Sequence, residues 1–398
     1  MKFWDNKGNI AVMASLTMPV VIGGAGFGVE TGYWYYEQLH LQQAADAAAY
    51  AAALEHYMGN ESNMLSGATN AATDNGFDSA ADDIDMTWPS ATYPSDERSV
   101  DIALSKDIPR GFTALFGSEP ITVHVKATAK YEPSSNACLL ALSKSASNAV
   151  WIHGNSTMNI SGCVVSSNSL SSESINTQGS SSASMPCATS AGGVDLNDNT
   201  TLTECDEPLE NQLPVADPYK DLPLPTPGAC QNFTGNNHNP GTYCGDIAMH
   251  GHVDTFSPGT YIFNGGHISV NGGDNGGMTC TGCTFIFLNG AYMTMNGNPP
   301  INLQAPTTGT YAGMLFIGDR TGTPVTNIFN GSASSKMTGT IYFPNDPVQY
   351  AGNFAGFNGC TQVVALTIEW TGNTNLGVDC SAYGIGTIQV GGRPYLVG

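Results

Sequence analysis

Charged side chains are scarce in this 398-residue chain, at 11% of its residues against about 25% in an ordinary globular protein. Most of the few charges are negative, with 33 Asp and Glu against 12 Lys and Arg. The net charge of −21 argues against nucleic acid or anionic lipid as a partner, because neither would be drawn to this surface. The chain is also 41% hydrophobic, which argues against disorder, since disordered chains usually combine high charge with low hydrophobicity.

Cysteine is absent before residue 138, and all ten cysteines of the chain lie from Cys138 onward. An even number confined to one part of the chain indicates disulfides formed in an oxidising compartment. Spacing does not settle the connectivity, but clustering favours the nearest neighbours: Cys138–Cys163, Cys187–Cys205, Cys230–Cys244, Cys280–Cys283 and Cys360–Cys380. The Cys280-Thr-Gly-Cys283 motif lacks a second ligand pair at zinc spacing, so a small loop-closing disulfide is favoured over zinc or redox chemistry.

Clustered acids and bases, which glycoside chemistry needs, are also missing. The best cluster is Asp319-Arg320 after the strand-like MLFI, and we interpret it as a surface ion pair that closes a turn. We interpret the two histidines of His250-Gly-His252 as ordinary side chains of a turn, and not as metal ligands together with Asp246 or Asp254. A single glycine-rich copy at residues 272–277 lacks the stacked neighbours of calcium-binding repeats. The sequence therefore predicts no enzyme, no catalytic residue, no cofactor and no metal.

One uncharged run stands out near the N-terminus. Ile10 to Val29 is 20 residues long, and as a helix it would span about 30 Å, the thickness of a bilayer core. Lys2 and Lys7 precede it and acidic residues from Glu30 onward follow, so the positive-inside bias predicts a single-pass inner-membrane protein with a cytoplasmic N-terminus. A cleaved signal peptide ending near residues 23–25 stays open as the alternative, although the helical pattern continues past that point.

The segment GNIAVMASLTMPVVIGGAGFGVETGYWYYEQLHLQQAADAAAYAAA (8–53) resembles the N-terminal signature of the TadG-like proteins of tight-adherence (Flp-type) pilus assembly. The Gly-Asn start, Pro19 in mid-membrane, the glycine-rich exit and the Ala-Ala-Asp-Ala-Ala-Ala motif around Asp46 carry the resemblance together. Family members usually have Asp in place of Glu30. Many also end in a von Willebrand type A domain, whose Asp-x-Ser-x-Ser motif is missing here, so metal-dependent adhesion is not implied.

Several residues of this segment are candidate assembly contacts. Gly24-x-x-x-Gly28 permits close helix packing and hence a homo-oligomer through the membrane helix. Glu30 could pair with a partner helix or an N-terminal amine, although snorkelling to the interface is the plainer explanation. The small side chains around Ala48 permit a partner to dock on the alanine-rich helix.

Residues 31–132 are expected to form this helix plus a small α+β module that is similar to pilins. The helix should stop near Gly59. Period-2 alternation predicts three strands, around residues 84–88, 100–104 and 121–130, with a helical turn at residues 111–116.

Residues 133–398 carry a repeat of short strands and glycine-containing turns. From Gly251 the marker glycines are spaced by 21, 25, 34, 21 and 20 residues, and turns at Gly179 and Asn197 fit the same frame. This period predicts a right-handed parallel β-helix stapled by disulfides, with a β-sandwich as the alternative. A proline-rich excursion at about 206–245 interrupts the frame, because proline cannot supply ladder donors. We expect it to be draped over the solenoid, and a flexible linker is the competing interpretation.

The sequence thus predicts a structural component of a tight-adherence pilus system, in the inner membrane and exposed to the periplasm or cell surface. A minor or tip-associated subunit supporting adhesion is one form of this hypothesis, with other pilus assembly proteins or pilins as implied partners. Two alternatives stay open: a membrane-tethered β-helix enzyme acting on polysaccharide, and a non-catalytic adhesin that binds surface glycans.

Overall fold

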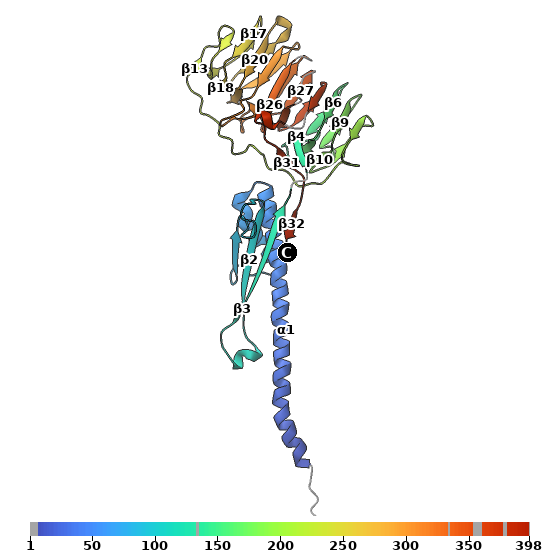
Figure 1. The fold of residues 1–398 in the computed structure, drawn as a ribbon, viewed down its shortest axis with the longest axis vertical. Coiled ribbons are helices and arrows are strands. Elements are labelled where there is room, and N and C mark those ends of the chain that lie inside the picture. Colours follow the sequence, from blue (N-terminus) through green and yellow to red (C-terminus); the bar gives the residue numbers. More distant parts are fainter. Residues whose placement is uncertain (1–6, 133–134, 333–334, 353–359, 377–379, 398) are drawn as a thin grey trace, which may run out of the picture. The chain divides into compact units, whose positions relative to one another are not determined.

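The computed structural model of the protein describes residues 7–132, 135–332, 335–352, 360–376 and 380–397. Its fold is mainly β with one long N-terminal helix, as the sequence predicts (Figure 1). The chain divides into two compact units. We call residues 1–132 with 393–398 the stalk unit, and residues 133–392 the solenoid unit. Lys2, on which part of the expected orientation depends, lies outside the described residues.

The stalk unit is built on helix α1 (Lys7–Tyr57), which contains Pro19 and ends just before Gly59 in the left-handed region at φ 74°. A short helical turn η1 (Glu61–Asn63) and helix α2 (Met64–Asp74) follow. The predicted strands are β1 (Asp83–Thr87), β2 (Ser99–Ile108) and β3 (Ile121–Tyr131), and the predicted turn is η2 (Phe112–Leu115). They form an antiparallel sheet in the order β1-β2-β3-β32.

Strand β32 (Pro394–Val397) closes this sheet by pairing with β3, Leu396 lying opposite Ala129. The solenoid was expected to continue to residue 398, so the end of the chain departs from that expectation. β32 pairs with β3 from Thr128 to Tyr131 and so covers the end of an edge whose backbone groups would otherwise be unpaired.

The solenoid unit consists of parallel sheets whose strands recur once per coil. The first sheet contains, in spatial order, β10 (Ala188–Ser190), β7 (Val164–Ser167), β4 (Ser135–Ala141), β28 (Thr361–Ala365), β26 (Lys336–Phe343), β24 (Met314–Ile317), β21 (Cys283–Leu288), β18 (Gly259–Asn264), β15 (Gly241–Cys244) and β13 (Cys230–Gln231). The second contains β11 (Val194–Asp195), β8 (Ile175–Thr177), β5 (Val150–Ile152), β29 (Ile368–Trp370), β27 (Val348–Gly352), β25 (Asn327–Gly331), β22 (Tyr292–Asn296), β19 (His267–Asn271) and β16 (Ile247–Met249).

A third face is formed by two ladders. One contains β12 (Thr200–Leu202), β9 (Ser182–Met185), β6 (Thr157–Ile160) and β30 (Thr374–Leu376), and the other β14 (Asn237–His238), β17 (Val253–Phe256), β20 (Gly277–Thr281) and β23 (Ile301–Gln304), which continues onto β26. Strand β31 (Ile388–Val390) pairs antiparallel with β4, and the turns η3 (Gly272–Asp274) and η5 (Ser381–Tyr383) complete the unit.

The strand register reproduces the repeat lengths seen in the sequence. Ile247 pairs with Ile268, and Ile268 pairs with Met293, which are steps of 21 and 25 residues. Asn327 pairs with Val348, and Val348 with Ile368, which are steps of 21 and 20 residues. Each predicted repeat is therefore one coil of a parallel β-helix.

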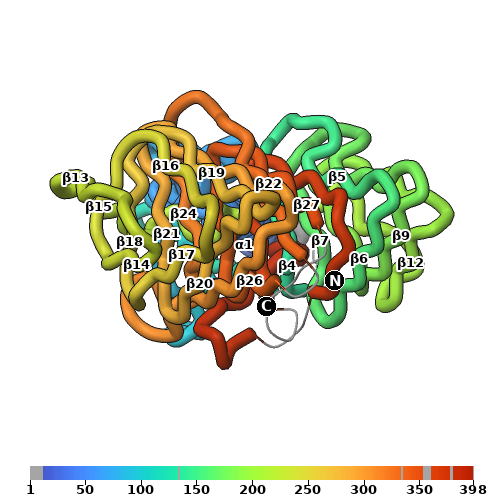
Figure 2. The backbone as a smooth tube through the Cα atoms, turned by 90° about the horizontal axis from the view of Figure 1, so that it is seen from above, coloured from blue at the N-terminus to red at the C-terminus, as the bar shows by residue number. Residues whose placement is uncertain are grey.

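The order of the coils in space differs from their order in the sequence. Strand β4, the first of the solenoid, pairs in parallel with β7 on one side and with β28, near the end of the chain, on the other. The chain thus enters the stack in its middle, builds one arm out to β10, and then passes to the far end at β13 and coils back. In Figure 2 the green and the yellow-to-red coils lie in one continuous stack.

The proline-rich residues 209–228, which we call the strap, make this order possible by running along the first sheet. Leu209 bonds to the backbone of β10, and Asn168 beyond β7 exchanges two 2.7 Å bonds with Val215. Farther along, the Tyr342 hydroxyl donates to Asp217, and Gly228 donates to Thr242 of β15. The strap therefore passes the coils in their spatial order.

The strap also covers apolar side chains on the outer face of the first sheet. Val215, Tyr219, Leu222 and Leu224 pack against a cluster that includes Ile286, Ile317 and Tyr342. Inside the coils, rings stack from one coil to the next, as between Phe285 and Phe316 and between Tyr350 and Trp370. The sheet thus has an apolar layer on both faces, as buried parallel sheets do.

The five disulfides of the structure are the five nearest-neighbour pairs, and they join Cys138 to Cys163, Cys187 to Cys205, Cys230 to Cys244, Cys280 to Cys283 and Cys360 to Cys380. Each bridge closes a local segment, which restricts the unfolded chain and so favours the coiled state.

The close approach of neighbouring coils gives a direct stability test at Gly372. A Cβ there would overlap the carbonyl group of Gly352 in the adjacent coil, whereas a Cβ at Gly386 would meet nothing within 4 Å. We expect Gly372→Ala to lower the free energy of unfolding of the solenoid by about 1–3 kcal/mol, the usual effect of overpacking. Urea denaturation followed by tryptophan fluorescence measures this change. An equal shift in Gly386→Ala would contradict the coil-contact explanation.

Candidate assembly site on the N-terminal helix

The first half of α1 presents apolar side chains to its surroundings. Large apolar residues between positions 12 and 29 are more than half exposed, Val20 and Val29 reaching 73% and 75%. The helix is long and apolar enough to cross a membrane. A run of exposed aliphatic side chains of this length is stable in lipid and unfavourable in water.

Gly24 and Gly28, which the sequence indicates as a helix-packing pair, lie on one face of this segment. A Cβ atom added at either position would meet nothing within 4 Å. Gly26 lies roughly on the opposite face, because two residues turn a helix by about 200°. There a Cβ would overlap the ring of Phe112 from the β2–β3 loop (residues 109–120). The helix therefore has one face against its own chain and one small-residue face with room for another helix. Pro19 lies within α1, seven residues before Gly26.

Glu30 is the residue that fastens the β2–β3 loop to the helix. It is 6% exposed, and its carboxylate accepts hydrogen bonds from the backbone amides of Gly111 and Thr113, at 2.8 and 2.6 Å, and from the Thr113 hydroxyl at 2.9 Å. The snorkelling interpretation is therefore wrong. The free amides at the start of η2 provide better partners than water does.

A second contact between α1 and the sheet lies two turns farther along the helix. Glu37 forms an ion pair with Lys106 of β2, with 2.9 Å between the carboxylate oxygen and the ammonium nitrogen. The Lys106 hydrogen bond lowers the pKa of Glu37, so the pair remains charged at neutral pH. Tyr33, Tyr35 and Tyr36, which surround this level of the helix, are between 48% and 63% exposed. Amphipathic rings in such a position are typical of a membrane–water interface.

Ala48 does not lie on a surface open to partners. It is fully buried with its alanine neighbours on α1, against Ile102 of β2, Ala129 of β3 and Ala68 of α2. The expectation that a partner docks on Ala48 is therefore wrong. Small side chains there bring the helix close to its own sheet. Asp46 lies beside this face and accepts a 2.8 Å bond from Gln42.

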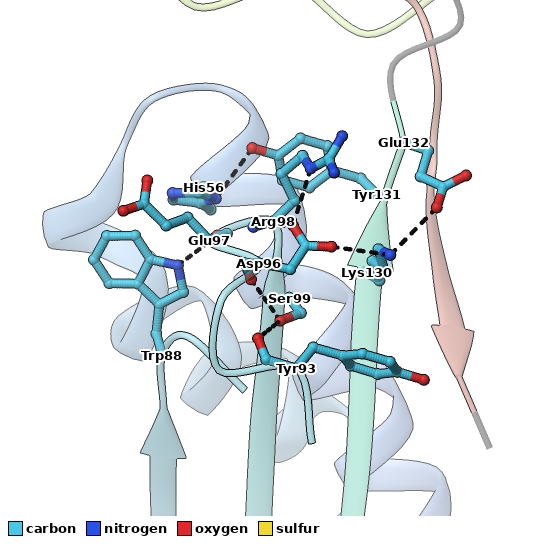
Figure 3. A network of polar contacts seen from close by, with 10 residues as sticks. All are labelled: His56, Trp88, Tyr93, Asp96, Glu97, Arg98, Ser99, Lys130, Tyr131 and Glu132. Carbon is cyan, nitrogen blue, oxygen red and sulfur yellow. Dashed lines mark hydrogen bonds and ion pairs between the residues drawn. The ribbon is translucent and has the colours of Figure 1, made fainter. Parts of the chain in front are cut away.

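A polar network holds the end of α1 to the sheet (Figure 3). Asp96 forms ion pairs with Arg98 and Lys130, at 3.0 and 2.9 Å. The Trp88 indole donates to the Glu97 carbonyl, and the Tyr131 hydroxyl lies 3.2 Å from His56 at the end of α1. Burial opposes ionisation of Asp96, but the bonds from Lys130 and Arg98 outweigh it and lower its pKa to about 2.

Asp319 and Arg320, the best catalytic pair of the sequence, are used separately. Asp319 accepts bonds from the backbone amides of Asn289 and Arg320. The Arg320 guanidinium donates to the strap carbonyls of Tyr219 and Leu222, at 2.8 and 2.7 Å. No ion pair joins Asp319 to Arg320 in the described part of the chain, so the ion-pair interpretation is wrong. The arginine instead donates to a segment rich in carbonyls and poor in amides.

The histidines near residue 250 do not form one site with the nearby acidic residues as a group. Asp254 is buried and bonds to His238 of β14 at 2.6 Å, with His252 at 3.4 Å. Among the described residues, no group of three or more His, Cys, Asp or Glu side chains is arranged so that it could hold a metal ion. His238 was not singled out in the sequence, because its partner lies in the next coil, 16 positions away.

Comparison with known families tests the N-terminal segment directly. Residues 8–55 match the family model described as Tad, putative Flp pilus-assembly TadE/G-like. This segment is a TadE/G-like domain. The domain lies entirely within α1, so it combines the exposed apolar segment with the buried alanine face. No curated protein and no solved structure matches the chain.

The Asp96 network at the end of the TadE/G-like helix predicts a pH dependence. Because the folded pKa of about 2 lies below the unfolded value of about 3.9, the ion pairs stabilise the stalk unit above pH 4. This stabilisation is lost as the pH falls from about 4 to 2. We expect Asp96→Asn to lower stability at pH 7 by about 1 kcal/mol, allowing for solvent screening.

Hydrogen exchange of the β2 and β3 amides, corrected for intrinsic rates, measures this effect in the stalk unit alone. Asp85→Asn serves as the control, because Asp85 is exposed on β1. Equal loss of protection in both variants would show that the network contributes nothing specific.

Proposed function

We propose that this protein is a structural component of a tight-adherence pilus system, anchored in the bacterial inner membrane by residues 12–29. In this proposal it is a minor or tip-associated subunit that supports surface adhesion, with the solenoid unit outside the cytoplasm. Other pilus assembly proteins or pilins would be its partners. The TadE/G-like domain supports the association with the pilus system, and the five disulfides support an oxidising compartment.

The observation that carries this proposal is the pair of opposite faces on α1. The stalk unit covers Gly26, whereas Gly24 and Gly28 have open space above them. In lipid, small residues at this spacing allow helices to pack closely, since backbones can approach each other. The open face is therefore where we place a partner helix of the pilus machinery or of a second copy.

The solenoid supports a role as a spacer or binding face rather than as an enzyme. Its interior is filled by stacked aromatic rings, and Arg320, its most promising catalytic residue, bonds to the strap. We therefore expect no lyase or hydrolase turnover.

The orientation of the anchor is tested by reporter fusions. A reporter that is active only in the periplasm, fused after Tyr57, should be active, because the positive-inside bias places everything after Glu30 outside the cytoplasm. Activity of a cytoplasmic reporter at the same position, with the periplasmic one silent, would reverse the placement of both units.

The open glycine face is tested by filling it. The double variant Gly24→Leu, Gly28→Leu should reduce surface pili and adherence at least tenfold, because the leucines hold a partner helix away. Gly23→Leu is the matched control. It adds the same side chain at another open glycine, which points about 120° away from the Gly24–Gly28 face. Membrane levels of each variant are measured in parallel, and pili are counted by electron microscopy.

The opposite pattern would move the function into the solenoid. If the glycine variants assemble normally and Asp319→Ala abolishes adherence or polysaccharide turnover, the enzyme alternative gains support. If adherence is lost while pili remain and the purified solenoid binds glycans without forming product, the adhesin alternative gains support.

A further inference from the structure

The β2–β3 loop of the stalk unit carries at its tip two apolar side chains that are almost fully exposed to solvent. Leu115 and Phe116 are 81% and 84% exposed, more than any other large apolar side chain among the described residues. They follow one another at the tip of the loop, so they form one apolar projection. In water this projection would be unfavourable, and none of the described residues of the stalk unit covers it.

The loop is held at the level where the apolar part of α1 ends. Gly111 and Thr113 bond to the Glu30 carboxylate, and the Phe112 ring packs on Gly26 one turn earlier. Figure 1 shows the loop between β2 and β3 running alongside α1. Because the anchor points Gly111, Phe112 and Thr113 lie within five residues of the tip, we place Leu115 and Phe116 at the same level as the last apolar turn of the helix.

A groove of about 600 Å³ between the helix and the loop has an apolar lining. Ile22, Ala25 and Val29 line it from the helix, and Pro109 and Phe112 line it from the loop. Its shape and chemistry suit an acyl chain, and it continues onto the exposed aliphatic surface of residues 12–29. The exposed tyrosines 33, 35 and 36 mark the aqueous boundary just beyond it.

We propose that the β2–β3 loop is a second membrane contact, which inserts Leu115 and Phe116 into the leaflet nearest Glu30 while lipid acyl chains fill the groove beside α1. The occupant is lipid rather than a protein because the groove is continuous with the surface that faces the bilayer. Arg110, which bonds to the Glu119 carbonyl and to Thr113, is then placed to reach lipid phosphates. The contact would fix the tilt of the stalk unit relative to the membrane, because a single membrane helix alone leaves the tilt of the stalk unit variable.

The proposal is tested on the full chain in nanodiscs of phosphatidylethanolamine and phosphatidylglycerol. All ten native cysteines are in disulfides, so a single introduced thiol takes up a fluorescent NBD label selectively. Labels at Leu115→Cys and Phe116→Cys are compared with Met18→Cys, within the membrane segment, and with Leu65→Cys, on α2. Met18 and Leu65 are 64% and 46% exposed, so every position accepts the label without unfolding.

Doxyl-labelled phospholipids should quench the labels at 115 and 116 at least threefold more than the label at 65, and nearly as strongly as the label at 18. Equal quenching at 115, 116 and 65, with strong quenching at 18, would overturn the proposal and leave a protein partner as the occupant of the loop. Because only lipid and this chain are present, quenching cannot come from another protein. Weak quenching at 18 would refute the membrane anchor itself, and with it this proposal.

Discussion

The stalk unit depends on the close packing of the alanine-rich half of α1 against its sheet. Ala45, Ala48 and Ala52 have no exposed surface, and their short side chains let the helix backbone approach β2, β3 and α2. Larger residues would hold the elements apart and leave the sheet with one uncovered apolar face. On the same helix, Glu30 bonds to the β2–β3 loop and Glu37 forms an ion pair with Lys106.

The two halves of α1 therefore lie in different surroundings. Between Val12 and Val29 its side chains are exposed, as lipid-facing residues are, and after Leu41 one face becomes a protein core. The change occurs without a break in α1, so the exposed apolar segment and the buried alanine face belong to one continuous helix.

Much of this fold could be predicted from the sequence, because local patterns carry it. The repeat lengths, the strands β1 to β3 and the neighbouring cysteines all follow from spacing within about 30 residues. The entry of the chain into the middle of the solenoid could not be predicted, because it depends on the pairing of β4 with β28, more than 200 positions away. Helix α2 was missed because its Ser, Thr, Asn and Gly content is typical of loops, and burial of Met64, Ala68 and Ala72 overrides that preference.

The candidate site divides in the same way. The open face of Gly24 and Gly28 follows from composition and spacing, whereas the role of Glu30 requires Gly111 and Thr113, about 80 residues away. For Ala48 the small side chains correctly indicated a close-packed face, but the face packs on the chain's own sheet and not on another protein. A face of small residues is equally suited to either. Only the tertiary structure distinguishes these two cases.

The scarcity of charge makes the position of each charged group informative. Lys106 holds β2 to α1, Lys130 and Arg98 hold Asp96, and Arg320 holds the strap. Lys126 pairs with the buried Asp101 within the sheet. In a catalytic site charges converge on one open cleft, where their desolvation activates them. Here Lys106 and Arg320 each bond to a segment that is distant in the sequence, whereas Arg98, Lys126 and Lys130 bond within the sheet of the stalk unit and the turn that leads into it. These charges therefore hold elements of their own unit together and are not gathered at one open cleft.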